Sequence, residues 1–347
     1  MRHKTLFLTV FIFAAIGAYA GLAVAQTAPQ THVAILVPDE LSPDCTALIG
    51  DFHAALQSEA GPAVTVERRA LIAADSSNDA LIITIAACDI PTRSLRLVFT
   101  TPPPPQTTRP LSARLIRDLQ TLPPLSIAIE AAAPDWSAGI QYAARILDLI
   151  GGQCADPDES APTPPTATPT GLHFLAGQCL YRNGQYAEAA AQLIAHRPAG
   201  ESGHDWRALS LWDATIADAL AQSFAFDRAL AWDDRNVLVV RTHARRSSTP
   251  LDTRLLAELY LLRGQHRLYL YEWDRVMADY DSAIGLAPEL ALGYYYRGIL
   301  HATLNRPAAA IDDLNHFLQL EDDPGHPLVT LAQAYLAELA PLVDAPG

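Results

Sequence analysis

Two hydrophobic patterns divide the chain. From His32 to about Gly152, short apolar runs alternate with stretches that have apolar residues at helical spacing, which predicts strands alternating with helices. The expected strands are HVAILVPD, AVTVERRAL, DALIITIAACD, SLRLVFTT and LSIAIEAAA. The expected helices are PDCTALIGDFHAALQSEAG, LSARLIRDLQTL and DWSAGIQYAARILDLIGG. This order predicts a small α/β domain with a mixed sheet over residues 31–152, followed by an all-helical region over 171–347.

The segment between the two regions has the composition of a linker. Residues 155–170 read ADPDESAPTPPTATPT and contain almost no large apolar side chains. Such a Pro- and Thr-rich stretch buries too little apolar surface to pack. We therefore place a linker at 153–170 and a domain boundary within it.

One stretch of the helical region repeats itself with a period of 34 residues, as in 298 − 264 for two of its glycines. A fixed period of this size indicates stacked helical repeats. The matching pairs are Tyr260 and Tyr294, Arg263 and Arg297, Gly264 and Gly298, Asp279 and Asp313, and Leu286 and Leu320. These residues resemble the tetratricopeptide repeat (TPR) family, in the variant with Tyr-x-x-Arg-Gly in the first helix and Ala-Asp-Tyr-Asp-x-Ala-Ile in the second. The resemblance implies a solenoid of helix-turn-helix units.

The repeated residues have structural explanations. Gly264 and Gly298 are expected where the first helix of a repeat comes closest to the second. Arg263 and Arg297 are expected to pair with Asp279 and Asp313 and so hold the helices together. A single repeat cannot bury its apolar face, so further repeats are expected. We place repeats at about 171–202, 203–236, 257–290 and 291–324, and a capping helix at 327–342.

The second repeat is the least regular. We assign Gly177 to the glycine position of the first repeat, and Ser210 to that of the second. From Ser210 to Gly264 is 54 residues, or 34 + 20, so about twenty extra residues are expected around 237–256. The basic sequence RTHARRSSTPLD falls in this insertion and is interpreted as a polar loop. Its arginines, Arg241 to Arg246, could meet an anionic partner, but a solvated loop is the preferred interpretation.

Charge and the first residues limit the possible functions. The chain of 347 residues has a formal net charge of −14, which argues against nucleic acid or an anionic membrane surface as partner. Residues 1–25 combine Arg2 and Lys4 with an apolar run and a small-residue cleavage site, which predicts a secretory signal. The alternative is an uncleaved anchor, which would be the protein's only attachment to a membrane. Lys4 is the only lysine, so a mature chain could form no Schiff base and has no P-loop lysine.

No catalytic, cofactor or metal motif is recognised in the sequence. The histidines are scattered, and ordinary surface or packing roles are preferred for them over metal binding. Asp39, Glu40 and Asp44 follow the first strand, where α/β domains often bind ligands; a polar loop and a helix start are the preferred interpretation. Trp136 is expected in the core.

If the TPR resemblance holds, the first helix of each repeat contributes residues to a concave groove. The expected groove residues are Phe174, Gln178, Tyr181, Arg182, Arg207, Leu211, Gln265, Tyr269, Tyr295 and Ile299. Aromatic and amide side chains with two arginines suit a peptide or an extended protein segment. The alternative is that some of them only fill the inner surface. The set of Lys, Arg and Asn with which the family clamps a peptide carboxylate is not present.

Four cysteines in an exported chain are expected to be oxidised. Of the three possible connectivities we choose Cys45–Cys88 and Cys154–Cys179. Cys45 follows the first strand and Cys88 ends the third, so parallel pairing of these strands would bring both to one edge. Cys154 and Cys179 flank the linker; alternatively, Cys179 faces the interior of the first repeat.

The sequence thus favours an exported, non-enzymatic protein of the envelope or the extracellular space, whose TPR groove binds a peptide or protein. The alternative is that the α/β domain binds or processes a small ligand, with the repeats as a regulatory or docking module. The order of elements in this domain resembles the α/β domain of TolB-like proteins. A polar pocket at the carboxyl ends of the strands would favour the alternative.

Overall fold

The computed structural model describes residues 31–38, 41–60, 64–70, 81–101, 111, 113–120, 122, 125, 127–156, 170–199, 205–247 and 249–343. The expected signal at 1–25, the residues Asp39 and Glu40, and most of the linker lie outside these ranges. The described chain divides between Ser223 and Phe224 into two compact units. The N-terminal unit ends at Ser223, and the C-terminal unit runs from Phe224 and also includes the described residues of 111–115.

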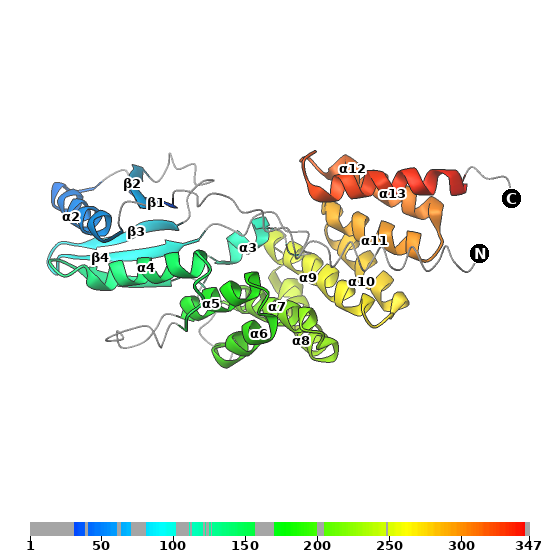
Figure 1. Ribbon diagram of the computed structural model, residues 1–347, viewed down its shortest axis with the longest axis horizontal. Coiled ribbons are helices and arrows are strands. Elements are labelled where there is room, and N and C mark those ends of the chain that lie inside the picture. The colour runs from blue at the N-terminus through cyan, green and yellow to red at the C-terminus, as the bar shows by residue number, and fades with distance from the viewer. Residues whose placement is uncertain are drawn as a thin grey trace. The chain divides into compact units, whose positions relative to one another are not determined.

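The N-terminal unit contains the predicted mixed sheet (Figure 1), with strand order β2-β1-β3-β4-β5. β1 is parallel to both β2 and β3, whereas β4 is antiparallel to β3 and β5. In chain order, the elements up to Ile150 are β1 (Thr31–Val37), α2 (Pro43–Ala60), β2 (Val64–Ala70), β3 (Leu81–Asp89), β4 (Ser94–Thr100), α3 (Ala113–Gln120), β5 (Ile127–Ala132) and α4 (Ser137–Ile150); of α3, the residues from Ile116 belong to this unit. The predicted order of strands and helices is confirmed.

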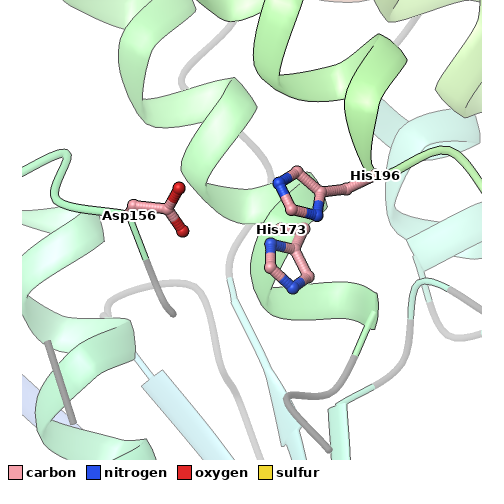
Figure 2. Close-up of side chains that lie close together, drawn as sticks. All are labelled: Asp156, His173 and His196. Atoms are coloured by element: carbon pink, nitrogen blue, oxygen red, sulfur yellow. The ribbon is translucent and has the colours of Figure 1, made fainter. Parts of the chain in front are cut away.

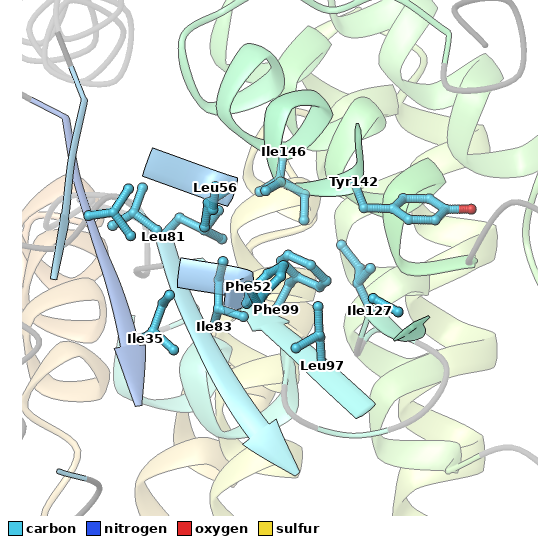
Figure 3. Close-up of a cluster of buried hydrophobic side chains, with 14 of the residues drawn as sticks. Ile35, Phe52, Leu56, Leu81, Ile83, Leu97, Phe99, Ile127, Tyr142 and Ile146 are labelled. Carbon is cyan, nitrogen blue, oxygen red and sulfur yellow. The ribbon is translucent and has the colours of Figure 1, made fainter. Parts of the chain in front are cut away.

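Helices α2 and α4 share an apolar core with the sheet. Side chains from β1, β3, β4 and β5 meet those of the two helices in one buried cluster (Figure 3). Phe52 of α2 is fully buried and packs edge to face on Trp136, with ring centroids 5.5 Å apart. A Cβ atom on Gly139 would lie 2.9 Å from a side-chain methyl group of Leu97 on β4, so glycine lets α4 come this close to the sheet without displacing that side chain. Trp136 is thus a core residue, as expected.

Two disulfide bonds are present, and they join the pairs chosen from the sequence. Cys45, in the first turn of α2, is bonded to Cys88 near the end of β3, with Cα atoms 6.1 Å apart. Because β1 and β3 are parallel neighbours, the end of β3 lies beside the residues that follow β1. Cys154 is bonded to Cys179 of helix α5, with Cα atoms 5.5 Å apart.

The rest of the described chain is an array of helices, as predicted for a TPR-like solenoid. The N-terminal unit contains α5 (Thr170–Arg182), α6 (Tyr186–Ala195) and α7 (Trp206–Gln222). The C-terminal unit contains α8 (Phe226–Ser247), α9 (Pro250–Leu268), α10 (Trp273–Leu286), α11 (Ala291–Thr303), α12 (Pro307–Leu320) and α13 (Pro327–Val343). From α8 to α13, each helix packs on the next (Figure 1). No described helix has both the length and the apolar character needed to span a bilayer.

The repeat glycines lie at close helix contacts. A Cβ atom added to Gly264 of α9 would lie 2.5 Å from the ring of Tyr280 on α10. The same test on Gly298 gives 3.0 Å to Leu314. In both repeats the contacted residue follows the glycine by 16 positions, since 280 − 264 = 314 − 298 = 16. The predicted role of these glycines is confirmed.

The register expected for the second repeat needs correction. In the other repeats the turn residue with positive φ follows the glycine by seven positions, as in Gly264 and Tyr271. Here that turn residue is Phe224, and counting back seven (224 − 7) assigns the glycine position to Ala217, not to Ser210. Ala217 and Ala229 are then 12 apart, the spacing that Gly264 and Val276 show. Helix α7 is longer than α5 and α11, so its turn, and with it the glycine position, lies further along the chain than a fixed period predicts.

The expected basic loop in the insertion is also wrong. Helix α8 continues to Ser247, and α9 begins at Pro250, so the extra residues lengthen both helices. No glycine or proline interrupts this part of α8. Thr249 caps the next helix, because its side chain accepts a hydrogen bond of 3.2 Å from the Asp252 amide. The arginines at 241, 245 and 246 are exposed on the last turns of α8.

Candidate binding surface

Several of the expected groove residues are packing residues in the structure. Phe174 is 2% exposed, and its ring lies 5.2 Å from that of Trp212. Tyr295 is 6% exposed and packs on Phe317, also with ring centroids 5.2 Å apart. The same burial applies to Tyr181 and Leu211. These four side chains therefore offer a partner almost no surface, and the interpretation of them as groove residues is replaced by a packing role.

Other expected groove residues keep some exposed surface. Gln178 is half-buried and accepts a hydrogen bond from Gln120, at 3.4 Å. The guanidinium group of exposed Arg182 donates to the Leu149 carbonyl, at 2.7 Å. Arg207 lies over the ring of Trp206, 4.5 Å from its centroid. These contacts fix the polar groups within the N-terminal unit.

In the C-terminal unit, Gln265, Tyr269 and Ile299 are half-buried. Gln265 and Ile299 are one period apart, since 299 − 265 = 34. Tyr269 stacks on Phe226, with ring centroids 4.7 Å apart and an interplanar angle of 17°. Tyr269 is thus one of the expected groove residues and also contacts aromatic residues that were not predicted as part of a binding surface.

This aromatic cluster consists of Phe224, Phe226, Tyr269, Tyr271 and Trp273. Phe226 contacts Phe224 edge to face, with ring centroids 6.1 Å apart, and also stacks on Tyr269. Tyr271 and Trp273, which follow Tyr269 in the chain, form a second edge-to-face pair at 5.4 Å. Phe224 is 82% exposed and Tyr271 is 55% exposed. Exposed aromatic rings that gather at one place on a protein are typical of an interaction surface.

The backbone at the two exposed rings is unusual. Phe224 and Tyr271 have φ values of 62° and 59°, in the left-handed region that bulky residues rarely adopt. The corresponding turns elsewhere contain Gly184 and Asn305, the residue types that tolerate this conformation. Two helix-helix turns therefore carry an aromatic side chain at a position where the fold favours glycine or asparagine.

The charged residues of the repeats are engaged with each other. Arg263 donates to both Asp279 on α10, at 3.1 Å, and Asp234 on α8, at 3.0 Å. Burial is the largest single influence and alone would lower the pKa of Arg263, but the hydrogen bond to Asp279 and the negative charges of Asp279 and Asp234 together raise the pKa. Arg267 donates to the same two carboxylates. The inter-helix pairing predicted for Arg263 and Asp279 is confirmed, and it leaves these cations committed to the fold.

Of the three candidate ligand residues that follow the first strand, the structure describes one, Asp44. Asp44 is exposed in the first turn of α2, next to the disulfide-bonded Cys45. Its preferred interpretation as a residue at a helix start is confirmed. The two acidic residues before it, at positions 39 and 40, lie outside the described residues.

Another group was missed in the sequence. Asp156, His173 and His196 each offer a ligand atom, and these atoms lie within 4.8 Å of one another (Figure 2). They come from three separate segments, 17 and 23 residues apart (173 − 156 and 196 − 173). No compact ligand spacing marks them, which is why the histidines were interpreted as scattered.

Comparisons with known proteins give limited information. No family model matches the chain, and no curated protein matches it. A solved structure, the "TPR2AB-domain:pHSP90-complex of yeast Sti1", is similar with a TM-score of 0.23 and 13% sequence identity, covering 58% of this chain and 95% of that chain. Nothing in these comparisons supports the resemblance to TolB-like proteins. The TPR-like assignment therefore depends on this chain's own helix pairs and glycine contacts.

Proposed function

We infer that the protein is an exported, non-enzymatic binding protein whose C-terminal helical repeats bind an extended peptide or a segment of a partner protein. The observation that carries this proposal is the aromatic cluster, in which Phe224 and Tyr271 are exposed beside the half-buried Tyr269. Aromatic residues are over-represented among those that contribute most to protein interfaces. The recognised segment would present aliphatic or aromatic side chains, because the nearby arginines are engaged in ion pairs.

The backbone of the two turns supports a functional role. A non-glycine residue in the left-handed region costs on the order of 1–2 kcal/mol. Phe224 recovers little of this cost by packing, since most of its ring is exposed. Strained positions of this kind gather at functional sites. Selection for binding would explain why two turns keep aromatic side chains that do not benefit folding.

Export is supported by the disulfides together with the expected signal. All four cysteines are paired, and such bonds persist in oxidising compartments. The net charge of −14 and the absence of lysine beyond Lys4 agree with a partner that is neither nucleic acid nor an anionic surface.

The proposal is tested by replacing both exposed rings with the residue that the turns favour. A random peptide library would be selected on residues 26–347 with the disulfides intact, and bound peptides would be measured by fluorescence anisotropy. The double variant Phe224→Gly and Tyr271→Gly is expected to weaken binding by about 100-fold or more. It should also unfold at higher urea concentration than the parent, because glycine relieves the strained turns.

Two control variants separate loss of the rings from other effects. Asn305→Gly makes the same change at an equivalent turn without removing an aromatic side chain. Leu238→Ala removes an exposed apolar side chain of α8 that is not part of the cluster. Both are expected to bind like the parent. Unchanged affinity of the double variant, or equal loss in the controls, would contradict a binding role for the aromatic cluster.

A further inference from the structure

We propose that Asp156, His173 and His196 form a binding site for a divalent transition-metal ion, with Zn²⁺ as the ion that fits best. The site belongs to the N-terminal unit and is independent of the aromatic cluster. Figure 2 shows the Asp156 carboxylate facing the two imidazole rings, with a nitrogen of each ring on the side toward it. The three ligand atoms lie within 4.8 Å of one another.

The fold brings the three residues together from separate elements. His173 is in the first turn of α5, and His196 follows the last residue of α6. Because α5 and α6 pack on each other, the beginning of one lies beside the end of the other. The two imidazole rings are stacked, with centroids 3.9 Å apart and an interplanar angle of 6°.

The second disulfide places the carboxylate. Cys179 is six residues after His173 on α5, a distance of about 9 Å along a helix axis. Asp156 is two residues after Cys154, which an extended chain spans in about 7 Å. Because Cys154 is bonded to Cys179, the two residues that lead from Cys154 to Asp156 start beside α5, within reach of His173. The disulfide thus limits Asp156 to the neighbourhood of the two rings.

The ligand set determines the class of ion. Two imidazole nitrogens and one carboxylate oxygen suit Zn²⁺ and related transition ions, whereas Ca²⁺ and Mg²⁺ prefer oxygen ligands alone. Ligand atoms around a tetrahedral Zn²⁺ ion are about 3.3 Å apart, so atoms that now lie within 4.8 Å of one another must approach by up to about 1.5 Å. His173 is 7% exposed and serves as the fixed ligand. Asp156 and His196 are half-buried and supply the movement. Water would complete the coordination.

The experiment measures Zn²⁺ binding to residues 26–347 with the disulfides intact, by competition with a chromogenic chelator. One Zn²⁺ per chain is expected. Asp156→Asn and His196→Gln should each weaken the affinity by about 100-fold or more, because even the loss of a residue that only supports a metal ligand costs about 10–100-fold. Co²⁺ is a second probe, and its visible spectrum should show nitrogen and oxygen ligands without thiolate charge transfer, since no cysteine is free.

Matched controls change the same residue types elsewhere. Asp148→Asn alters an exposed aspartate of α4, and His316→Gln alters an exposed histidine of α12. Both should bind Zn²⁺ like the parent. Neither Asp156 nor His196 is in the core, so both site variants are expected to fold like the parent. Circular dichroism melting in the presence of chelator checks this. Equal affinity in parent and site variants, or equal losses in site variants and controls, would overturn the proposal and indicate adventitious surface binding.

Discussion

Arg297 and Asp313 form a two-point hydrogen-bonded ion pair between α11 and α12. Arg297 donates from Nε to Oδ2 at 2.8 Å and from Nη2 to Oδ1 at 2.7 Å. Asp313 raises the pKa of Arg297, mainly through these hydrogen bonds. The same pairing occurs one repeat earlier, between Arg263 and Asp279. In each repeat the arginine directly precedes the glycine of the close helix contact. Two adjacent residues therefore allow the two helices to approach and join them by an ion pair.

Neutralising this pair should destabilise the C-terminal unit. Asp313→Asn leaves a guanidinium group with 23% exposure facing an amide, and the free energy of unfolding should fall by about 2 kcal/mol. This is below the value for a fully buried pair, because Arg297 still reaches water and also donates to Asp281. The double variant Arg297→Met and Asp313→Leu should recover most of the loss. Urea unfolding of Arg297→Met, Asp313→Leu and the double variant completes a double-mutant cycle that measures the coupling, and additive effects would contradict a cooperative pair.

His301 should make stability depend on pH. Burial lowers its pKa below the ordinary value of 6.5, although Asp313, 3.8 Å away, acts in the opposite direction. The unfolded chain therefore binds a proton at this position more readily than the folded chain. The free energy of unfolding should fall as the pH drops below 6.5 toward the lower, folded pKa. Chemical unfolding of the parent and of His301→Gln over this range tests the effect, since the variant should lose part of the pH dependence. Identical pH profiles would contradict it.

The repeat glycines provide a pair of opposite predictions. Gly264→Ala places a methyl group against Tyr280 and should lower the free energy of unfolding by about 1–3 kcal/mol. Gly285→Ala, in α10, meets nothing within 4 Å and should raise it by about 0.5–1 kcal/mol, because alanine is the better helix residue. Thermal melts of both variants decide the matter. Equal effects of the two substitutions would show that helix propensity, and not a close contact, determines the role of Gly264.

The disulfide between α2 and β3 should stabilise the N-terminal unit. It closes a loop with a sequence separation of 43 residues. In the chain-entropy model, a loop of this size corresponds to about 4 kcal/mol. Cys45→Ala with Cys88→Ala should therefore lower the urea midpoint of this unit markedly, while the C-terminal unit unfolds as before. The Cys154–Cys179 bond closes a shorter loop, of 25 residues in sequence separation. Its removal by Cys154→Ala with Cys179→Ala should lower the free energy of unfolding by slightly less, about 3.5 kcal/mol. A larger loss from the shorter loop would contradict an entropic origin.

The amino-acid sequence by itself determined the elements and the helix pairs. Period-two and helical spacing are local properties, so the order of strands and helices could be predicted before any contact was known. The close helix contact at Gly264 and the ion pair of Arg263 could be predicted because they also depend on local geometry. A helix-turn-helix unit has nearly fixed geometry, so a residue and its partner 16 positions later meet in every copy that keeps the same helix length.

The tertiary structure decided what depends on neighbours from elsewhere in the chain. The longer α7 shifted the second repeat and moved its glycine position to Ala217, which a fixed period cannot indicate. Tyr295 has the same local pattern whether it lines a groove or, as found, packs on Phe317. Asp156 comes near His173 only because a disulfide and a helix pair fold three segments together. Burial and proximity depend on how the whole chain packs. Periodicity depends only on local backbone geometry, so it alone can be recognised from the order of residues.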